Sequence, residues 1–174
     1  ILQNMKKKIY YVMDTICGWC YGFNDVITKI HEKHKDKFDF EIIPSAMWGD
    51  NLAIVADTFF GGYIKNITVS IEELTSVYFG EAYKNVLDNG DRVLDSLPGA
   101  KAIVLFQKSN KDMAFDFLQQ IQKAFFVNGE DLNDITVYTR IAESFGISKE
   151  EFEKNSLHNY CMKKLLNTLK KANN

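Results

Sequence analysis

The feature that most constrains this chain is a cysteine pair, Cys17 and Cys20, placed between an apolar run and an amphipathic segment. Residues 9–13 are continuously apolar and rich in strand formers, which predicts a strand covered on both faces. After Cys17 the apolar residues recur at helical spacing. Those residues are Phe23, Val26, Ile27 and Ile30. The C-x-x-C pair is therefore predicted to lie where a strand ends and a single amphipathic helix begins.

A second strand is predicted at residues 38–42, where apolar and polar residues alternate strictly. A strand, a helix and a second strand in this order form a right-handed crossover with parallel strands. The carboxyl ends of parallel strands lie at the same edge of the sheet. The loop of residues 44–49 is therefore expected near Cys17, and its Met47 and Trp48 become candidate substrate-binding residues.

Residues beyond 50 are predicted to be almost entirely helical. A capping-box pattern at residues 70–73 predicts a helix that runs to about residue 90. Further helices are predicted to begin at Pro98, Asn110, Ile135 and Ser148. The last of these is expected to reach Lys171. We therefore expect a strand–helix–strand portion at residues 5–49 and a helical domain at residues 50–174.

This order of elements leaves a sheet that is incomplete. Two parallel strands followed only by helices would leave the first strand, which is apolar on both faces, with an unpaired edge. Either another molecule supplies further strands, or they follow Asn174. We favour the second explanation.

The cysteine pair admits three interpretations. A structural zinc site would need further ligands, and the candidates are His31, His34, His158 and Cys161. Two thiols could also simply pack as small apolar groups. Neither reading explains why the pair follows a strand and opens a helix, and an odd total of three cysteines argues against a disulfide scaffold. We therefore favour redox chemistry and predict no metal.

Redox chemistry requires a thiolate, and the start of a helix stabilises one through free backbone N–H groups. Cys17 occupies that position, and Cys20 lies one turn further on, where it can attack a mixed disulfide. Gly18 is expected to let the backbone turn tightly, and Trp19 to cover the pair without adding charge. Because no His or Lys separates the cysteines, a lowered pKa would come mainly from the helix end, and Asp14 would oppose it.

Composition narrows the class of protein. The 174 residues include 21 basic and 23 acidic side chains, a formal net charge of −2, which does not favour a nucleic-acid partner. No apolar run reaches the roughly 18 residues that a membrane span needs. The apolar run before Asp14 is too short for a secretory signal. These observations predict a cytoplasmic protein without nucleic-acid or membrane partners.

The segments DTICGWCYGF and FVNGEDLNDITVYTRIAESFGI, within this order of elements, resemble the DsbA-like thioredoxin-fold proteins, particularly their FrnE-like cytoplasmic branch. The resemblance implies an α/β thioredoxin-like fold with an inserted helical domain. It also implies thiol–disulfide oxidoreductase activity, with Cys17 as the attacking cysteine and Cys20 as the resolving one. Thr15 departs from the proline found in many relatives. The family's cis-proline has no counterpart here, since Pro44 belongs to the loop after the second strand and Pro98 to the helical region.

The leading hypothesis is a thiol–disulfide oxidoreductase that acts on protein or small-molecule disulfides through Cys17 and Cys20, with Trp19, Met47 and Trp48 contacting the substrate. It needs no bound cofactor, and glutathione is a candidate redox partner. One alternative is a redox-sensing or non-catalytic adaptor on the same fold. The other is a glutathione-dependent isomerase or transferase, although such enzymes generally carry serine at the first cysteine position. The oligomeric state and the direction of the reaction stay open.

Overall fold

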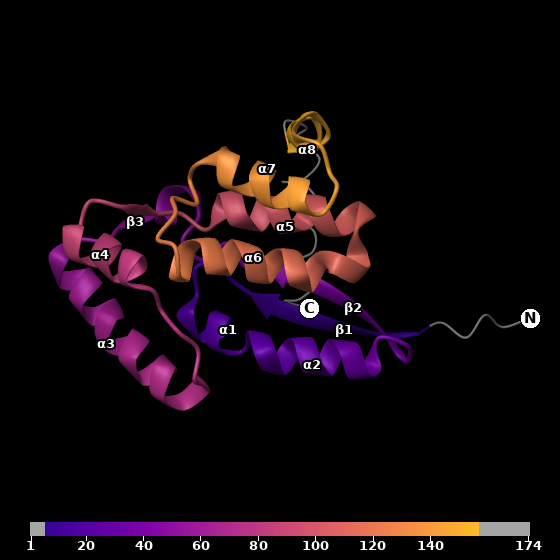
Figure 1. The fold of residues 1–174 in the computed structure, drawn as a ribbon, viewed down its shortest axis with the longest axis horizontal. Coiled ribbons are helices and arrows are strands. Elements are labelled where there is room, and N and C mark those ends of the chain that lie inside the picture. Colours follow the sequence, from indigo (N-terminus) through magenta and orange to yellow (C-terminus); the bar gives the residue numbers. More distant parts are fainter. Residues whose placement is uncertain (1–5, 157–174) are drawn as a thin grey trace, which may run out of the picture.

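Strands β1 (Lys7–Met13) and β2 (Phe38–Pro44) form a parallel pair connected through helices α1 (Gly18–Gly22) and α2 (Asn24–His34). The computed structural model describes residues 6–156. Ile9 pairs with Phe40 and Met13 with Pro44, so both strands end at the same edge. Figure 1 shows this edge beside α1, in indigo and purple. The predicted strand–helix–strand unit is confirmed, although Pro44 ends β2 itself and does not belong to the following loop.

The prediction that β1 is covered on both faces is wrong for the part of the chain that the structure describes. Met13 is buried, but Tyr10 and Val12 are each 54% exposed. The helices pack on the opposite face, where the Tyr11 ring stacks on Phe115 with centroids 6.1 Å apart. Within residues 6–156, β1 pairs with β2 only. The expectation that further strands complete the sheet stays a prediction.

The helix after the cysteines also differs from expectation. It is interrupted at Phe23, so that α1 has five residues and α2 begins at Asn24. The buried face of α2 carries Asn24, Ile27 and His31. Of the four residues expected on this face, Ile27 is buried as predicted, whereas Phe23, Val26 and Ile30 are exposed by 41%, 47% and 37%.

Contacts with α6 and β2 explain why this face of α2 is the buried one. The Asn24 side-chain amide donates to Gln122 Oε1 at 2.7 Å. The His31 ring lies against Phe40 and Phe115, with centroid distances of 5.0 and 4.7 Å. Polar and aromatic partners on α6 and β2 therefore decide which face is buried, and the apolar periodicity of α2 does not.

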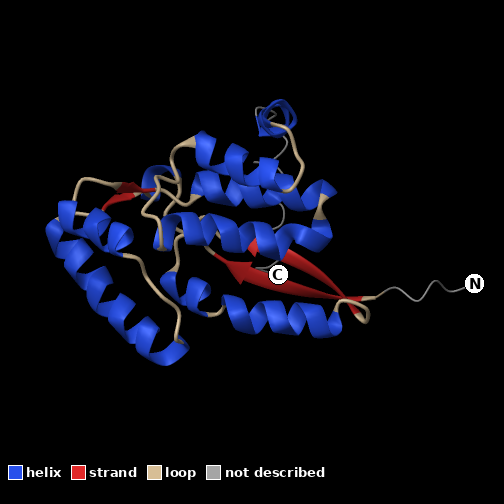
Figure 2. Cartoon of the chain, viewed as in Figure 1, coloured by secondary structure: helices blue, strands red, loops and turns tan. Residues whose placement is uncertain are grey.

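The remaining described chain is mainly helical, as predicted (Figure 2). Its helices are α3 (Thr58–Thr75), α4 (Glu81–Asn89), α5 (Leu97–Ser109), α6 (Ala114–Phe126), α7 (Ile135–Ser144) and α8 (Lys149–Ser156). Single 3₁₀ turns lie at Asp50–Leu52 and Lys111–Met113. A short antiparallel ladder of β3 (Ile54–Val55) and β4 (Val93–Leu94) was not expected from the sequence.

The predicted helix from residue 70 to residue 90 is wrong in both its start and its continuity. The N-cap of α3 is Asp57, whose Oδ1 accepts from the Phe60 N–H at 2.8 Å. Ser70 lies inside α3 and donates its hydroxyl back to the Asn66 carbonyl. Ser76 then adopts a left-handed conformation, with φ of 60°, which ends α3 before α4 begins.

Most of the other predicted helix boundaries agree with the structure. Pro98 lies in the first turn of α5, Gly146 follows α7 with φ of 82°, and Ser148 Oγ accepts from the Glu151 N–H at 3.2 Å. Asn110 is the exception, because its side-chain amide donates to the Phe106 carbonyl and a 3₁₀ turn precedes α6. The predicted extension of the last helix to Lys171 lies outside the described residues.

Buried apolar residues from both parts of the chain join in one cluster, which includes Met13, Ile42, Ile71, Phe117 and Phe152. The boundary proposed between residues 49 and 50 stays a prediction. No cis peptide bond occurs among residues 6–156.

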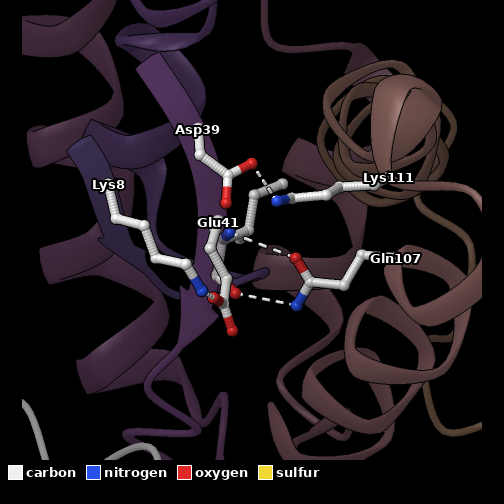
Figure 3. A network of polar contacts seen from close by, with 6 residues as sticks. Lys8, Asp39, Glu41, Gln107 and Lys111 are labelled. Carbon is white, nitrogen blue, oxygen red and sulfur yellow. Dashed lines mark hydrogen bonds and ion pairs between the residues drawn. The ribbon is translucent and has the colours of Figure 1, made fainter. Parts of the chain in front are cut away.

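Helix α5 covers the outer edge of β2 through one side chain (Figure 3). The amide of Gln107 accepts from the Ile42 N–H at 3.1 Å and donates to the Ile42 carbonyl at 2.8 Å. It therefore satisfies both backbone groups as a neighbouring strand would. Lys111 pairs with Asp39 beside it, and Lys8 pairs with Glu41 at 3.1 Å.

Replacing Gln107 tests how much its hydrogen bonds to the edge of β2 contribute to the stability of the fold. We expect Gln107→Met to lower the free energy of unfolding by about 2 kcal/mol, because two backbone groups of a buried residue lose their partners. Lys111→Met removes an exposed ion pair from the same network and should cost less than about 1 kcal/mol. Denaturant unfolding of both variants measures the difference. Equal losses would contradict the edge-covering role.

Candidate active site

Cys17 is the N-cap residue of α1, as the sequence predicted. Its extended backbone, with φ of −83° and ψ of 113°, follows directly from the end of β1. Its sulfur accepts from the Cys20 N–H at 3.4 Å. Both thiols are half-buried and free. The two sulfurs therefore belong to a single helical turn at the edge where β1 and β2 end.

The two thiols differ strongly in acidity. A hydrogen bond from the Cys20 thiol, together with the backbone N–H groups of Cys20 and Trp19, lowers the pKa of Cys17 to about 6. Burial and the nearby Asp14 carboxylate act in the opposite direction. The helix end contributes as expected, but the Cys20 thiol is the larger influence, which corrects the sequence-based expectation.

The same hydrogen bond acts in reverse on the second cysteine. Because its proton is held between the two sulfurs, and because it is buried, the pKa of Cys20 is raised well above its usual range. At neutral pH Cys17 is therefore largely ionised, whereas Cys20 keeps its proton.

Gly18 serves packing and not the tight turn that we expected. The described glycines with positive φ are Gly90, Gly129 and Gly146. A Cβ atom on Gly18 would lie 2.9 Å from Ile71 Cδ1. The missing side chain lets α3 approach the helix that carries the cysteines.

Asp14 fixes the geometry around Cys17, a role that its sequence position did not reveal. Its side chain is buried, and its Oδ1 accepts from the Ile16 N–H at 3.0 Å. Its Oδ2 accepts from the Ser45 hydroxyl at 3.2 Å and from the Met47 N–H at 2.7 Å. A single carboxylate thus joins the segment before Cys17 to the loop after β2.

That loop is held at a second point. The Trp48 N–H donates to the Ser96 hydroxyl at 3.0 Å, and the Ser96 N–H donates to the Trp48 carbonyl at 3.2 Å. Ser96 is fully buried, so these bonds are shielded from water. Ala46 has a φ of 49°, a conformation that costs a non-glycine residue about 1 kcal/mol or more. The surrounding bonds maintain this strained turn beside the cysteines.

Four of the five candidate residues from the sequence line one cavity of about 220 Å³, and Cys20 is not among its lining residues. Cys17, Trp19, Met47 and Trp48 all line it, together with Ile64, Ile67 and Ile71 from α3. Apart from the Cys17 thiolate, none of its lining side chains carries a charge. Trp19 is 48% exposed and Met47 is 52% exposed, so both are accessible at its mouth. The roles of these residues in binding stay predictions.

Within residues 6–156 we looked for a metal site and for a membrane-spanning helix, and found neither. No group of three or more His, Cys, Asp or Glu side chains there could hold a metal ion. Of the four candidate zinc ligands, His31 is buried among aromatic rings and the His34 ring lies 6.2 Å from that of Phe38. His158 and Cys161 lie outside this range. In the same range, no helix combines the length and apolar character needed to cross a membrane.

Comparison with known proteins decides the family. A family model described as thioredoxin matches residues 10–174. The chain belongs to the thioredoxin family. No curated protein matches its sequence significantly.

Solved structures similar to this thioredoxin-family chain share its fold. One is the crystal structure of a "putative protein disulfide isomerase" from Nitrosomonas europaea, with a TM-score of 0.82 and 22% identity over 96% of this chain and 78% of that one. Another is the cytosolic disulfide reductase DsbM from Pseudomonas aeruginosa with GSH, with a TM-score of 0.77 and 20% identity over 95% and 79% of the two chains. The predicted DsbA-like thioredoxin fold is confirmed.

The acidity of Cys17 can be tested through alkylation. In a Cys161→Ala background, the rate of reaction with iodoacetamide should rise with pH through a midpoint near 6 and then level off, because only the thiolate reacts. Cys20→Ala removes the hydrogen bond from the thiol and should raise that midpoint by about 1 to 2 pH units. A midpoint that does not move in Cys20→Ala would contradict the thiol–thiol hydrogen bond as the main cause.

Proposed function

We propose that this chain is a thiol–disulfide oxidoreductase acting on protein or small-molecule disulfides. The observation that carries the proposal is the unequal pair at the start of α1, with an acidified Cys17 and a protonated Cys20 one turn away. A nucleophile with a pKa near 6 is largely ionised at neutral pH, while its partner keeps its proton until a mixed disulfide forms.

The reaction follows from this arrangement. The Cys17 thiolate attacks one sulfur of a substrate disulfide, forms a mixed disulfide, and releases the other sulfur as a thiolate. Cys20 then loses its proton and attacks Cys17 Sγ. The Cys17–Cys20 bond forms, and the second substrate sulfur leaves as a thiolate that takes up a proton. The substrate gains two electrons and the cysteine pair loses two; the reverse sequence oxidises a dithiol.

The structural neighbours support this class of reaction, since one is described as a "putative protein disulfide isomerase" and the other as a cytosolic disulfide reductase. The DsbM structure contains GSH, which supports glutathione as a redox partner that could recycle the pair here. That neighbour is also cytosolic, in agreement with the location that we predict. We extend the proposal to the FrnE-like branch on the resemblance of the CGWC segment.

The uncharged side chains that line the cavity around Cys17 support an apolar contact with the substrate. Its wall includes Cys17, and Trp19 and Met47 stand partly exposed at its mouth. A residue that flanks a substrate cysteine could place an apolar side chain there while the disulfide meets Cys17. We therefore propose Trp19, Met47 and Trp48 as substrate-binding residues.

The central test is Cys17→Ser. We expect disulfide reduction to fall at least about 1000-fold, because a serine hydroxyl is not ionised near neutral pH. Cys161→Ser is the matched control for loss of a thiol and should keep its activity. Turnover of a fluorogenic peptide disulfide with glutathione measures both. Unchanged reduction by Cys17→Ser would defeat the proposal, and a partner retained by a protein without both cysteines would favour the adaptor alternative.

The substrate contact can be tested separately with Met47→Gln, which keeps side-chain length and adds no charge near Cys17. We expect kcat/KM to fall about 5-fold for a peptide disulfide with a leucine beside the cysteine, since about 1 kcal/mol of apolar burial is lost. Hydroxyethyl disulfide, which lacks that side chain, should react normally. Leu74→Gln changes an exposed residue of α3 outside the cavity and serves as the control. Equal effects on both substrates would argue against the contact.

A further inference from the structure

Tyr11 carries a buried hydroxyl that the proposed reaction has not used. Its ring lies between Phe115, at a centroid distance of 6.1 Å, and Phe23, at 6.2 Å. Its Oη is shielded from solvent and has no hydrogen-bond partner among the described residues. A buried hydroxyl without a partner costs stability. The position of such a group next to reactive residues therefore calls for a functional explanation.

The reactive residues in question are the two cysteines. Tyr11 lies on β1, the strand that ends just before Cys17, and its ring contacts Phe23, the C-cap of the helix that carries Cys20. Tyr11 and Cys20 are both partly buried and pack against the same hydrophobic core. Burial raises the pKa of the Tyr11 hydroxyl first, and the charges that add to this effect are those of Cys20 and then Cys17. The hydroxyl therefore keeps its proton and remains a hydrogen-bond donor, and the charges of both sulfurs affect its pKa.

Cys20 lacks stabilisation at one particular moment of the reaction. In the free protein its proton is shared with the Cys17 sulfur, but a Cys17 sulfur bound to substrate is no longer a thiolate that can hold that proton. Cys20 must then become a thiolate in a half-buried position. The groups that act most on it include the Asp14 backbone and the Asp14 carboxylate, and no cation.

We propose that the Tyr11 hydroxyl donates a hydrogen bond to the Cys20 sulfur while Cys20 resolves the mixed disulfide. This inference rests on the proposed function and concerns only its second step. Cys20 gives its proton to solvent and Tyr11 keeps its own. The Cys20 sulfur then bonds to Cys17 Sγ, and the substrate sulfur leaves with the electron pair of the broken S–S bond. The hydroxyl without a partner in the resting protein thus acquires an acceptor during resolution.

Tyr11→Phe tests this role because it removes one oxygen and leaves the ring. Tyr10→Phe is the matched control: it lies next in sequence and its side chain is 54% exposed on the other face of β1. The probe is dithiobis(nitrobenzoate), used in a Cys161→Ala background. Attack by Cys17 releases a first nitrothiobenzoate, and resolution by Cys20 releases a second, so stopped-flow absorbance separates the two steps.

In Tyr11→Phe we expect the first phase to keep its rate and the second to slow about 10-fold or more, the factor for losing one hydrogen bond to a charged sulfur. Tyr10→Phe should leave both phases unchanged. The Tm of Tyr11→Phe should be equal to or above that of the parent, because a buried hydroxyl without a partner is gone. A structural role alone would not combine a stable fold with one slowed step.

Two results would overturn the inference by itself: a second phase in Tyr11→Phe within 2-fold of the parent, or equal slowing of both phases with a lower Tm. Absence of the first phase in the parent protein would overturn the proposed function and this inference with it. The two failures are therefore distinguishable in a single experiment.

Discussion

Parallel pairing of β1 with β2 brings the residues at the ends of both strands to the same edge of the sheet, and the buried carboxylate of Asp14 joins them there. Its oxygens accept from Ile16 ahead of Cys17 and from Ser45 and Met47 after β2. Cys17 and the cavity wall are therefore built as one unit. The carboxylate also has a cost, because its charge opposes ionisation of the very thiol that it positions.

That opposition is overcome without a cation. The hydrogen bond from Cys20 and two backbone N–H groups outweigh both burial and Asp14 at Cys17. A thiolate stabilised mainly by its own partner loses that stabilisation as soon as it has reacted, since the partner must then give up its proton. Besides Cys17, the cavity is lined by uncharged and mostly apolar side chains, so the thiolate has no charged neighbour in the cavity wall.

Local patterns in the sequence were enough for the strand–helix–strand unit, the cysteines at the start of a helix, and several helix ends. Each depends on short-range chemistry, such as the alternation in residues 38–42, Pro98 in a first turn, or Ser148 beside Glu151. The topology of parallel strands then placed Met47 and Trp48 near Cys17 before any coordinates were known. The capping-box pattern at Ser70 failed because a local motif cannot show that the helix had already begun, and Asp57 caps that helix thirteen residues earlier.

The sequence by itself thus determined which residues are the candidates for thiol chemistry and at which edge of the sheet they lie, because strand direction and helix starts are local properties. Only the tertiary structure decided the buried face of α2, where Gln122 and Phe115 select Asn24 and His31 over more apolar neighbours. It also decided the acidity of Cys17, which depends on the orientation of the Cys20 thiol, and the isolation of the Tyr11 hydroxyl. These features arise from contacts between residues distant in sequence or from side-chain orientation, and periodicity encodes neither.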